Sequence, residues 1–299
     1  MRRALVLFSG AALALGALLS TATASAYCRS NTCDPKKDPD ECRNGGDFCS
    51  GPGHPLVWAS SCVTFAVQED GSPKHRISEQ RFAEEVNNAF QTWLEVDCGD
   101  GTTPSLSVEN NGPVECDKVE YNQRDGNANV FMFRDEEWPY AGGEDALGLS
   151  TIRFDPNSGF IYDVDVEING TDTPISVGDP VEPGNADLAS ILTHEVGHFL
   201  GLSHSKERGA TMLPGYSPGD DSLRSLHFDD ELGICDALNP DRRPTSKSCE
   251  PRHGFSSDCG SNKEAQGCST RSPGPGSSAV GLLVLGLTLG ASRLRRARR

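Results

Sequence analysis

THEVGHFLGLSH (residues 193–204) holds three of the seven histidines in the chain, with a glutamate directly after the first. On an α-helix, residues four apart lie on one face, so His194 and His198 are expected to present their imidazoles side by side. Gly201 lets the chain leave the helix in a conformation that other residues resist, and the turn brings His204 back as a third ligand. Three histidines leave one position of a zinc ion open, which is typical of a catalytic site. We therefore predict that His194, His198 and His204 bind Zn²⁺.

Glu195 lies one residue round the helix from the predicted ligands. It is near enough to hold a water molecule but is not aimed at the ion. The alternative interpretation is that these histidines are ordinary core or surface residues. The added glycine and third histidine make the pattern much more specific than HExxH alone, and this favours the metal site.

The pattern HExxHxxGxxH resembles that of the metzincin metalloproteases. "GATMLPGY" (209–216) supplies the methionine turn of that group through Met212. Ser205 directly after the third histidine, and Pro214 two residues after Met212, resemble the matrixin branch. "LHFDDELGICDAL" (226–238) is similar to the start of the matrixin C-terminal helix.

This resemblance implies a zinc endopeptidase that hydrolyses peptide bonds of extracellular proteins. Glu195 would be the catalytic general base, taking a proton from a zinc-activated water and passing it to the leaving amine. "ALGLSTIRF" (146–154) is a candidate edge strand for an extended substrate, although an ordinary interior strand fits nearly as well. Tyr216 is a candidate border of the pocket after the cleaved bond. The alternative function is a non-catalytic, zinc-containing surface binding module or adhesin.

The hydrophobic pattern changes period several times between residues 54 and 240. Together with the resemblance, the order strand, helix, strands, helix predicts an α/β (α+β) sandwich of metzincin type. We expect a twisted mixed sheet, an active-site helix and a C-terminal helix after the methionine turn. The predicted helices span residues 78–96, with Ser78 as N-cap, and 187–200; the predicted strands span 61–67, 105–110, 129–133, 149–154 and 162–169.

Both ends of the chain have sequence patterns that are typical of targeting or anchoring signals. Residues 1–26 combine two arginines, an apolar run and Ala24-Ser25-Ala26, which predicts a signal peptide and a secreted or cell-surface protein. Residues 269–299 contain thirteen apolar residues and then five arginines, and resemble the MYXO-CTERM sorting tails of some Gram-negative surface proteins. The resemblance implies a short hydrophobic helix and transient membrane attachment; a plain, permanent tail anchor is the alternative.

Ten of the eleven cysteines lie between Cys28 and Cys259, and an exported chain can pair them in up to five disulfides. The connectivity does not follow from sequence, although Cys249 and Cys259 are candidates for local bonds. The predicted organisation is a Cys-rich extension at 27–53, a matrixin-like domain at 54–240, a polar linker at 241–268 and the tail.

The formal net charge of −16 disfavours nucleic acid as a partner. Calcium is a candidate structural ion, with carboxylates in "RDEEWPYAGGED" (134–145) and "YDVDVEINGTD" (162–172). The partner that we expect is a polypeptide substrate, and we expect the protein to be a monomer. Animal matrixins carry a PRCGxPD pro-segment and a second zinc site with upstream histidines. No such string occurs here, and His54 and His75 lie far from the expected strands.

Overall fold

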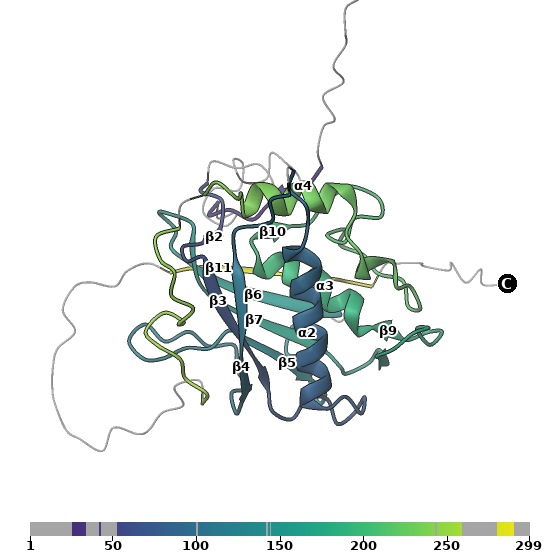
Figure 1. Ribbon diagram of the computed structural model, residues 1–299. Coiled ribbons are helices and arrows are strands. Elements are labelled where there is room, and N and C mark those ends of the chain that lie inside the picture. The colour runs from purple at the N-terminus through teal and green to yellow at the C-terminus, as the bar shows by residue number, and fades with distance from the viewer. Residues whose placement is uncertain are drawn as a thin grey trace, which may run out of the picture.

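A computed structural model describes residues 26–33, 42, 53–99, 101–141, 143, 145–242, 244–258 and 280–289. At its centre is a sheet with the strand order β11-β6-β7-β5-β3-β4, in which β2 also pairs with β7. Figure 1 shows this sheet with helices α2 and α3 beside it. The predicted α/β architecture with a mixed sheet is confirmed. The predicted signal peptide lies outside the described residues, apart from Ala26.

The central strands of the sheet are parallel, and the strands at the edge formed by β6 and β11 are antiparallel. β3 pairs in parallel with β4 and β5, and β5 in parallel with β7. β6 and then β11 add to β7 in antiparallel fashion. The strands expected from alternation all form, although β4 extends further along the chain than predicted. Their bounds are Val57–Trp58 (β2), Cys62–Gln68 (β3), Ser107–Val114 (β4), Val130–Arg134 (β5), Gly148–Phe154 (β6), Phe160–Asn169 (β7) and Gly281–Leu285 (β11).

Each of the three long helices begins at a side-chain cap, which satisfies a backbone N–H that would otherwise lack a partner. Ser78 accepts a hydrogen bond from the backbone of the first turn of α2 (Glu79–Leu94), as predicted. Asp187 does the same for α3 (Leu188–Phe199), and His227 for α4 (Phe228–Ala237). The remaining elements are short: Cys28–Arg29 (β1), Ile175–Ser176 (β8), Ala186–Asp187 (β9), Leu202–Ser203 (β10) and the 3₁₀ turn η1 (Ser222–Arg224).

Aromatic side chains fix both α2 and α3 to one face of the sheet. The ring centroid of Phe131 on β5 lies 5.9 Å from those of Phe90 on α2 and Phe199 on α3. Phe90 and Phe199 are themselves 5.0 Å apart. All three side chains are buried, so α3 is held by the main hydrophobic core.

Disulfides join segments that are distant in the sequence. Cys62 pairs with Cys249 and Cys98 with Cys235, across separations of 187 and 137 residues. A local bond between Cys249 and Cys259 is therefore wrong, because Cys249 lies beside the start of β3. Within the Cys-rich extension, Cys33 bonds Cys42. Cys28 and Cys116 are also disulfide-bonded.

The segments on either side of the predicted domain lie against it. In the extension, β1 pairs with β10, and the backbone N–H groups of Tyr27 and of Ala26 just before it donate to Asp229 of α4. In the predicted linker, Thr245 N donates to the backbone of Ala59. These hydrogen bonds attach both segments to the central domain.

The apolar C-terminal stretch differs from the expected helix. Its residues Gly281–Leu285 form the extended strand β11 against β6. An apolar run of this length fits either a strand or a helix, and the free edge of β6 offers hydrogen-bond partners to a strand. Within the described ranges, no helix is both long and apolar enough to cross a membrane. Attachment through the tail stays a prediction.

Candidate metal centre and substrate cleft

The structure brings the three predicted histidine ligands together at the end of α3. Ring centroids of His194 and His198 lie 4.8 Å apart, and that of His204 lies 5.3 and 4.9 Å from them. One ligand nitrogen from each ring fits within 4.8 Å of the other two. The turn depends on Gly201, whose φ is +97° and where an added Cβ would lie 2.7 Å from the Leu56 carbonyl oxygen. This agrees with the predicted role of the glycine.

Two of the rings are already oriented for a metal. Nδ1 of His194 lies 2.6 Å from the Thr211 carbonyl oxygen, and Nδ1 of His198 lies 3.0 Å from that of Leu202. A carbonyl only accepts, so each Nδ1 carries the hydrogen and each Nε2 presents a lone pair. Both Nε2 atoms are buried and have no hydrogen-bond partner among the described residues. Since such an atom is costly to leave unpaired, the donor set fits a zinc ion.

Burial favours the uncharged form of these side chains. It lowers the pKa of His194 to about 3, and His204 adds to this effect. Burial also lowers the pKa of His198 well below its usual value, with further contributions from the other two rings. A histidine must be neutral to bind a metal, so burial favours the binding form of His194 and His198.

Glu195 is fixed by residues far away in the sequence. Its Oε2 accepts a hydrogen bond of 2.7 Å from Ser150 Oγ on β6, and its Oε1 accepts one of 3.0 Å from Leu287 N. A Cβ at Gly148 would lie 2.7 Å from Oε1, so this position leaves room for the carboxylate. Burial raises the pKa of Glu195 to about 8, opposed by these two hydrogen bonds. Sequence reasoning missed Ser150 and Gly148, because they belong to no motif.

Met212 lies beneath the histidines. It is buried, and a Cβ added at Gly197 of α3 would lie 2.2 Å from its sulfur. Backbone N–H groups of Thr211 and Met212 donate to the Asp230 carboxylate of α4 at 2.7 and 3.1 Å. The methionine turn is thus held in place by the C-terminal helix that the resemblance implied.

Tyr216, the predicted pocket border, is buried next to the start of α3. Its hydroxyl donates to the Asp220 carbonyl oxygen and accepts from Asp187 N. Asp187 also forms an ion pair with Arg224, at 2.7 Å. These contacts connect the loop after the methionine turn to the start of α3.

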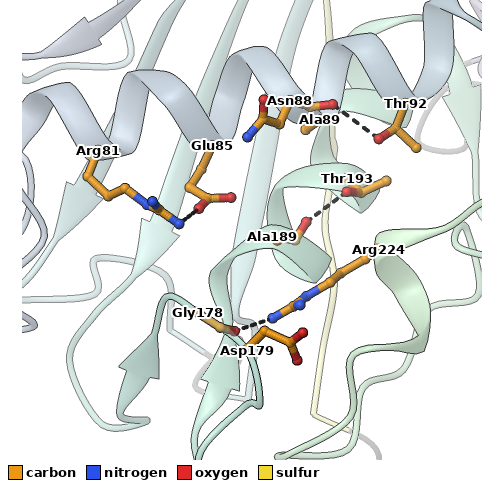
Figure 2. Close-up of a pocket in the computed structure, with 10 residues that line it drawn as sticks. All are labelled: Arg81, Glu85, Asn88, Ala89, Thr92, Gly178, Asp179, Ala189, Thr193 and Arg224. Carbon is orange, nitrogen blue, oxygen red and sulfur yellow. Dashed lines mark hydrogen bonds and ion pairs between the residues drawn. The ribbon is translucent and has the colours of Figure 1, made fainter.

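Figure 2 shows a different hollow, of about 420 Å³, between α2, α3 and the loops below them. The ion pair between Arg81 and Glu85 lies along its wall. Neither Glu195 nor any of the three clustered histidines lines it, so it is separate from the metal centre. Its lining consists of Arg81, Glu85, Asn88, Ala89, Thr92, Gly178, Asp179, Ala189, Thr193 and Arg224.

The acidic residues proposed for calcium are in part engaged already. Glu167 pairs with Arg134 at 2.5 Å, and Asp165 accepts from the backbone of Glu120 and Val130. Asp163 differs, because both of its buried oxygens find no hydrogen-bond partner in the part of the chain described. Calcium binding at this segment stays a prediction.

The burial of Asp163 is expected to make stability depend on pH. Burial raises its pKa to about 8, with Arg153 acting in the opposite direction. The unfolded chain loses this proton near about pH 4, whereas the folded chain keeps it. The free energy of unfolding should therefore fall between about pH 4 and 8, by at most about 1.4 kcal/mol per pH unit for this one group. Urea unfolding in calcium-free buffer measures this slope, and Asp163→Asn should reduce it, while buried Asp165, whose pKa is also raised by desolvation, keeps part of the dependence. A parent protein equally stable across the range would contradict the prediction.

The mixed sheet, the helix with three converging histidines and the methionine turn beneath them define a metzincin-type catalytic domain. The family model described as Matrixin matches residues 57–237, which is more than half of the chain. The chain belongs to the matrixin family.

Several curated relatives are similar to the same region. Neutrophil collagenase from Homo sapiens is 27% identical over 217 residues, which cover 70% of this chain and 40% of that protein. Matrix metalloproteinase-16 from Rattus norvegicus is 29% identical over 186 residues, covering 61% of this chain and 27% of the relative. Metalloendoproteinase 1-MMP from Arabidopsis thaliana is 41% identical over 54 residues, 18% of this chain and 15% of the relative. The chain spans less than half the length of these relatives.

Zinc is expected to stabilise the fold, because it would be bound by the two buried Nε2 atoms of His194 and His198. At roughly 100 times its Kd, a ligand that binds only the folded state adds about 3 kcal/mol to the free energy of unfolding. Thermal unfolding with and without zinc measures this gain. It should disappear in His198→Ala and persist in His54→Ala, which removes an exposed histidine. An equal gain in both variants would place the zinc elsewhere.

Proposed function

We propose that the chain is a zinc-dependent endopeptidase, secreted or held at the cell surface, that hydrolyses peptide bonds of extracellular polypeptides. Membership of the matrixin family supports this. The observation that carries the proposal is the position of Glu195 beside the three clustered histidines. Its Oε1 accepts a hydrogen bond from a main-chain N–H, that of Leu287.

His194, His198 and His204 would hold the zinc ion. When bound, zinc supplies a Lewis acid that polarises a scissile carbonyl and favours ionisation of water. Glu195 then accepts a proton from the attacking water at Oε1 and delivers it to the nitrogen of the leaving amine. Ser150 holds Oε2 during both transfers, so the carboxylate keeps its orientation.

An extended substrate would lie along β6 and pair with its main chain. β6 has β7 on one side, and its other side, at which β11 pairs, is the edge that a substrate strand would use. The backbone N–H of Tyr216 would hold the substrate on the opposite side, after the cleaved bond.

Digestion of an unfolded protein tests the proposed activity. The zinc-loaded chain should cut it, lose this activity with a chelator and regain it when zinc is returned. The second candidate function, a zinc-containing surface binding module, predicts no cleavage by a chain that binds zinc fully. That result would replace the enzyme proposal.

The proposal also includes export of the chain. The signal at residues 1–26 supports a mature chain that begins near Tyr27, and the C-terminal tail supports transient or permanent attachment to a membrane. Sequencing the N-terminus of the protein recovered from cells and from their medium tests this. A chain that keeps residues 1–26 and stays inside the cell would contradict it.

A further inference from the structure

The C-terminal segment lies where an extended substrate is proposed to bind. Residues 281–285 pair antiparallel with β6, from Gly281 opposite Phe154 to Leu285 opposite Ser150. Figure 1 shows β11 beside β6 at the edge of the sheet. The chain continues past β11, with Thr288 opposite Ala146 and Leu289 next to Tyr216.

Main-chain groups after β11 are bonded around the metal centre. The Gly286 carbonyl oxygen lies 2.9 Å from His204 Nε2, and the next N–H, from Leu287, donates to Glu195. The Leu287 carbonyl oxygen accepts from Leu147 N at 2.7 Å. The carbonyl oxygen of Thr288 accepts from Tyr216 N at 2.9 Å, and the following N–H donates to the Asp145 backbone at 2.7 Å. The peptide bond from Gly286 to Leu287 thus has its oxygen at a ligand histidine and its nitrogen at the proposed base.

The side chains of this segment alternate as those of a bound strand should. Leu285 and Leu287 are buried in the same hydrophobic cluster as the core of the domain. Leu282 and Val284 are exposed by 57% and 42%. A Cβ at Gly286 would lie 2.1 Å from the Gly148 carbonyl oxygen, so this close approach to the edge strand needs a glycine. Backbone and side chains of this segment therefore both fit against β6 and the core beside it.

We propose that this chain is its own substrate: the segment 281–289 binds in the cleft as an extended strand and is hydrolysed between Gly286 and Leu287. The inference rests on the proposed endopeptidase function and names a substrate for the same site. Until the bond is cut, the segment covers the edge of β6 and competes with external polypeptides.

The reaction consumes one water molecule. Its oxygen forms a bond to the Gly286 carbonyl carbon, and the bond from this carbon to Leu287 N breaks. One water proton passes through Glu195 to the leaving nitrogen. The other is lost from the new carboxyl group and completes the ammonium. The products are a chain that ends in the Gly286 carboxylate and a peptide that begins with the Leu287 ammonium. If the tail anchors the protein, the cut separates the catalytic domain from it.

Mass spectrometry of the zinc-loaded full chain tests this inference. The expected products are a chain that ends at Gly286 and a released peptide that starts at Leu287. The rate should not change on dilution, because the segment binds within its own molecule. Leu287→Lys puts a charge on a buried position and should slow the cut more than about tenfold. The matched control Leu282→Lys places the same charge on an exposed position and should leave the rate unchanged.

Hydrogen exchange gives a readout that does not depend on catalysis. In the zinc-free chain, the amides of Leu287 and Leu289 should be protected. Protection should be lost in Leu287→Lys and kept in Leu282→Lys. Fast exchange in the parent chain would overturn the proposed docking.

Adding an unfolded protein to the same reaction separates the two proposals. If the added protein is cut while the tail stays whole, or is cut at another bond, the self-hydrolysis proposal fails and the endopeptidase proposal stands. If the zinc-loaded chain cuts neither substrate, both fail. Cleavage between Gly286 and Leu287 at the parent rate in Glu195→Gln would point to a contaminating protease and also overturn self-hydrolysis.

Discussion

Glu195→Gln is expected to lower kcat for peptide hydrolysis by about 10²- to 10⁴-fold, the usual contribution of a general base. The amide is nearly isosteric and can still accept the hydrogen bond from Ser150. It cannot take a proton from water near neutral pH. Because Glu195 is not among the three clustered ligand residues, zinc content should stay unchanged. Initial rates on a peptide, measured with metal analysis of the same sample, check both statements.

Glu207→Gln is the matched control, since it makes the same substitution at an exposed site close in the sequence. It should retain the parent rate. Ser150→Ala gives an intermediate case, because it keeps the carboxylate and removes one bond that orients it. A Glu195→Gln protein as active as the parent, with full zinc content, would exclude the proposed role of this residue.

The histidine cluster was predictable because its geometry is local. A spacing of four residues places His194 and His198 on one helical face in any α-helix. Gly201 supplies the positive φ that the following turn needs. The N-cap at Ser78 and the alternating strands follow from equally short-range rules. Such patterns depend on a few neighbouring residues and survive in the folded chain.

What sequence reasoning missed depends on contacts between distant segments. Ser150 meets Glu195 across 45 positions, and nothing near Ser150 indicates such a partner. Cys249 was a candidate for a local bond, whereas β3 brings Cys62 next to it. Pairing of this kind is set by the completed sheet.

The apolar C-terminal run illustrates another limit. Composition alone does not separate a short apolar strand from a short apolar helix. The alternation of buried Leu285 and Leu287 with exposed Val284 becomes visible only against β6. A membrane and a buried protein surface both favour apolar residues. The sequence therefore favoured a helix at a membrane, whereas the structure places part of the run in a strand against β6.

Trp93→Ala is expected to lower the free energy of unfolding by about 3–5 kcal/mol, as for other fully buried aromatic side chains. The indole of Trp93 is completely buried on α2, and its N–H donates to the Thr193 carbonyl oxygen at 2.7 Å. Its ring also touches α3 at Gly197, where an added Cβ would lie 2.8 Å from the indole. Because Gly197 lies between His194 and His198, the cavity should also weaken zinc binding.

Two variants separate these effects. Trp93→Phe keeps an aromatic ring in the core and should cost less than Trp93→Ala. Trp138→Ala removes an indole that is only half-buried, and it should leave zinc affinity unchanged. Urea unfolding of the metal-free proteins measures the free energy of unfolding, and zinc titration measures the affinity for zinc. If Trp93→Ala were no more destabilising than Trp138→Ala, the aromatic support beneath the histidine helix would not be what holds the metal centre in position.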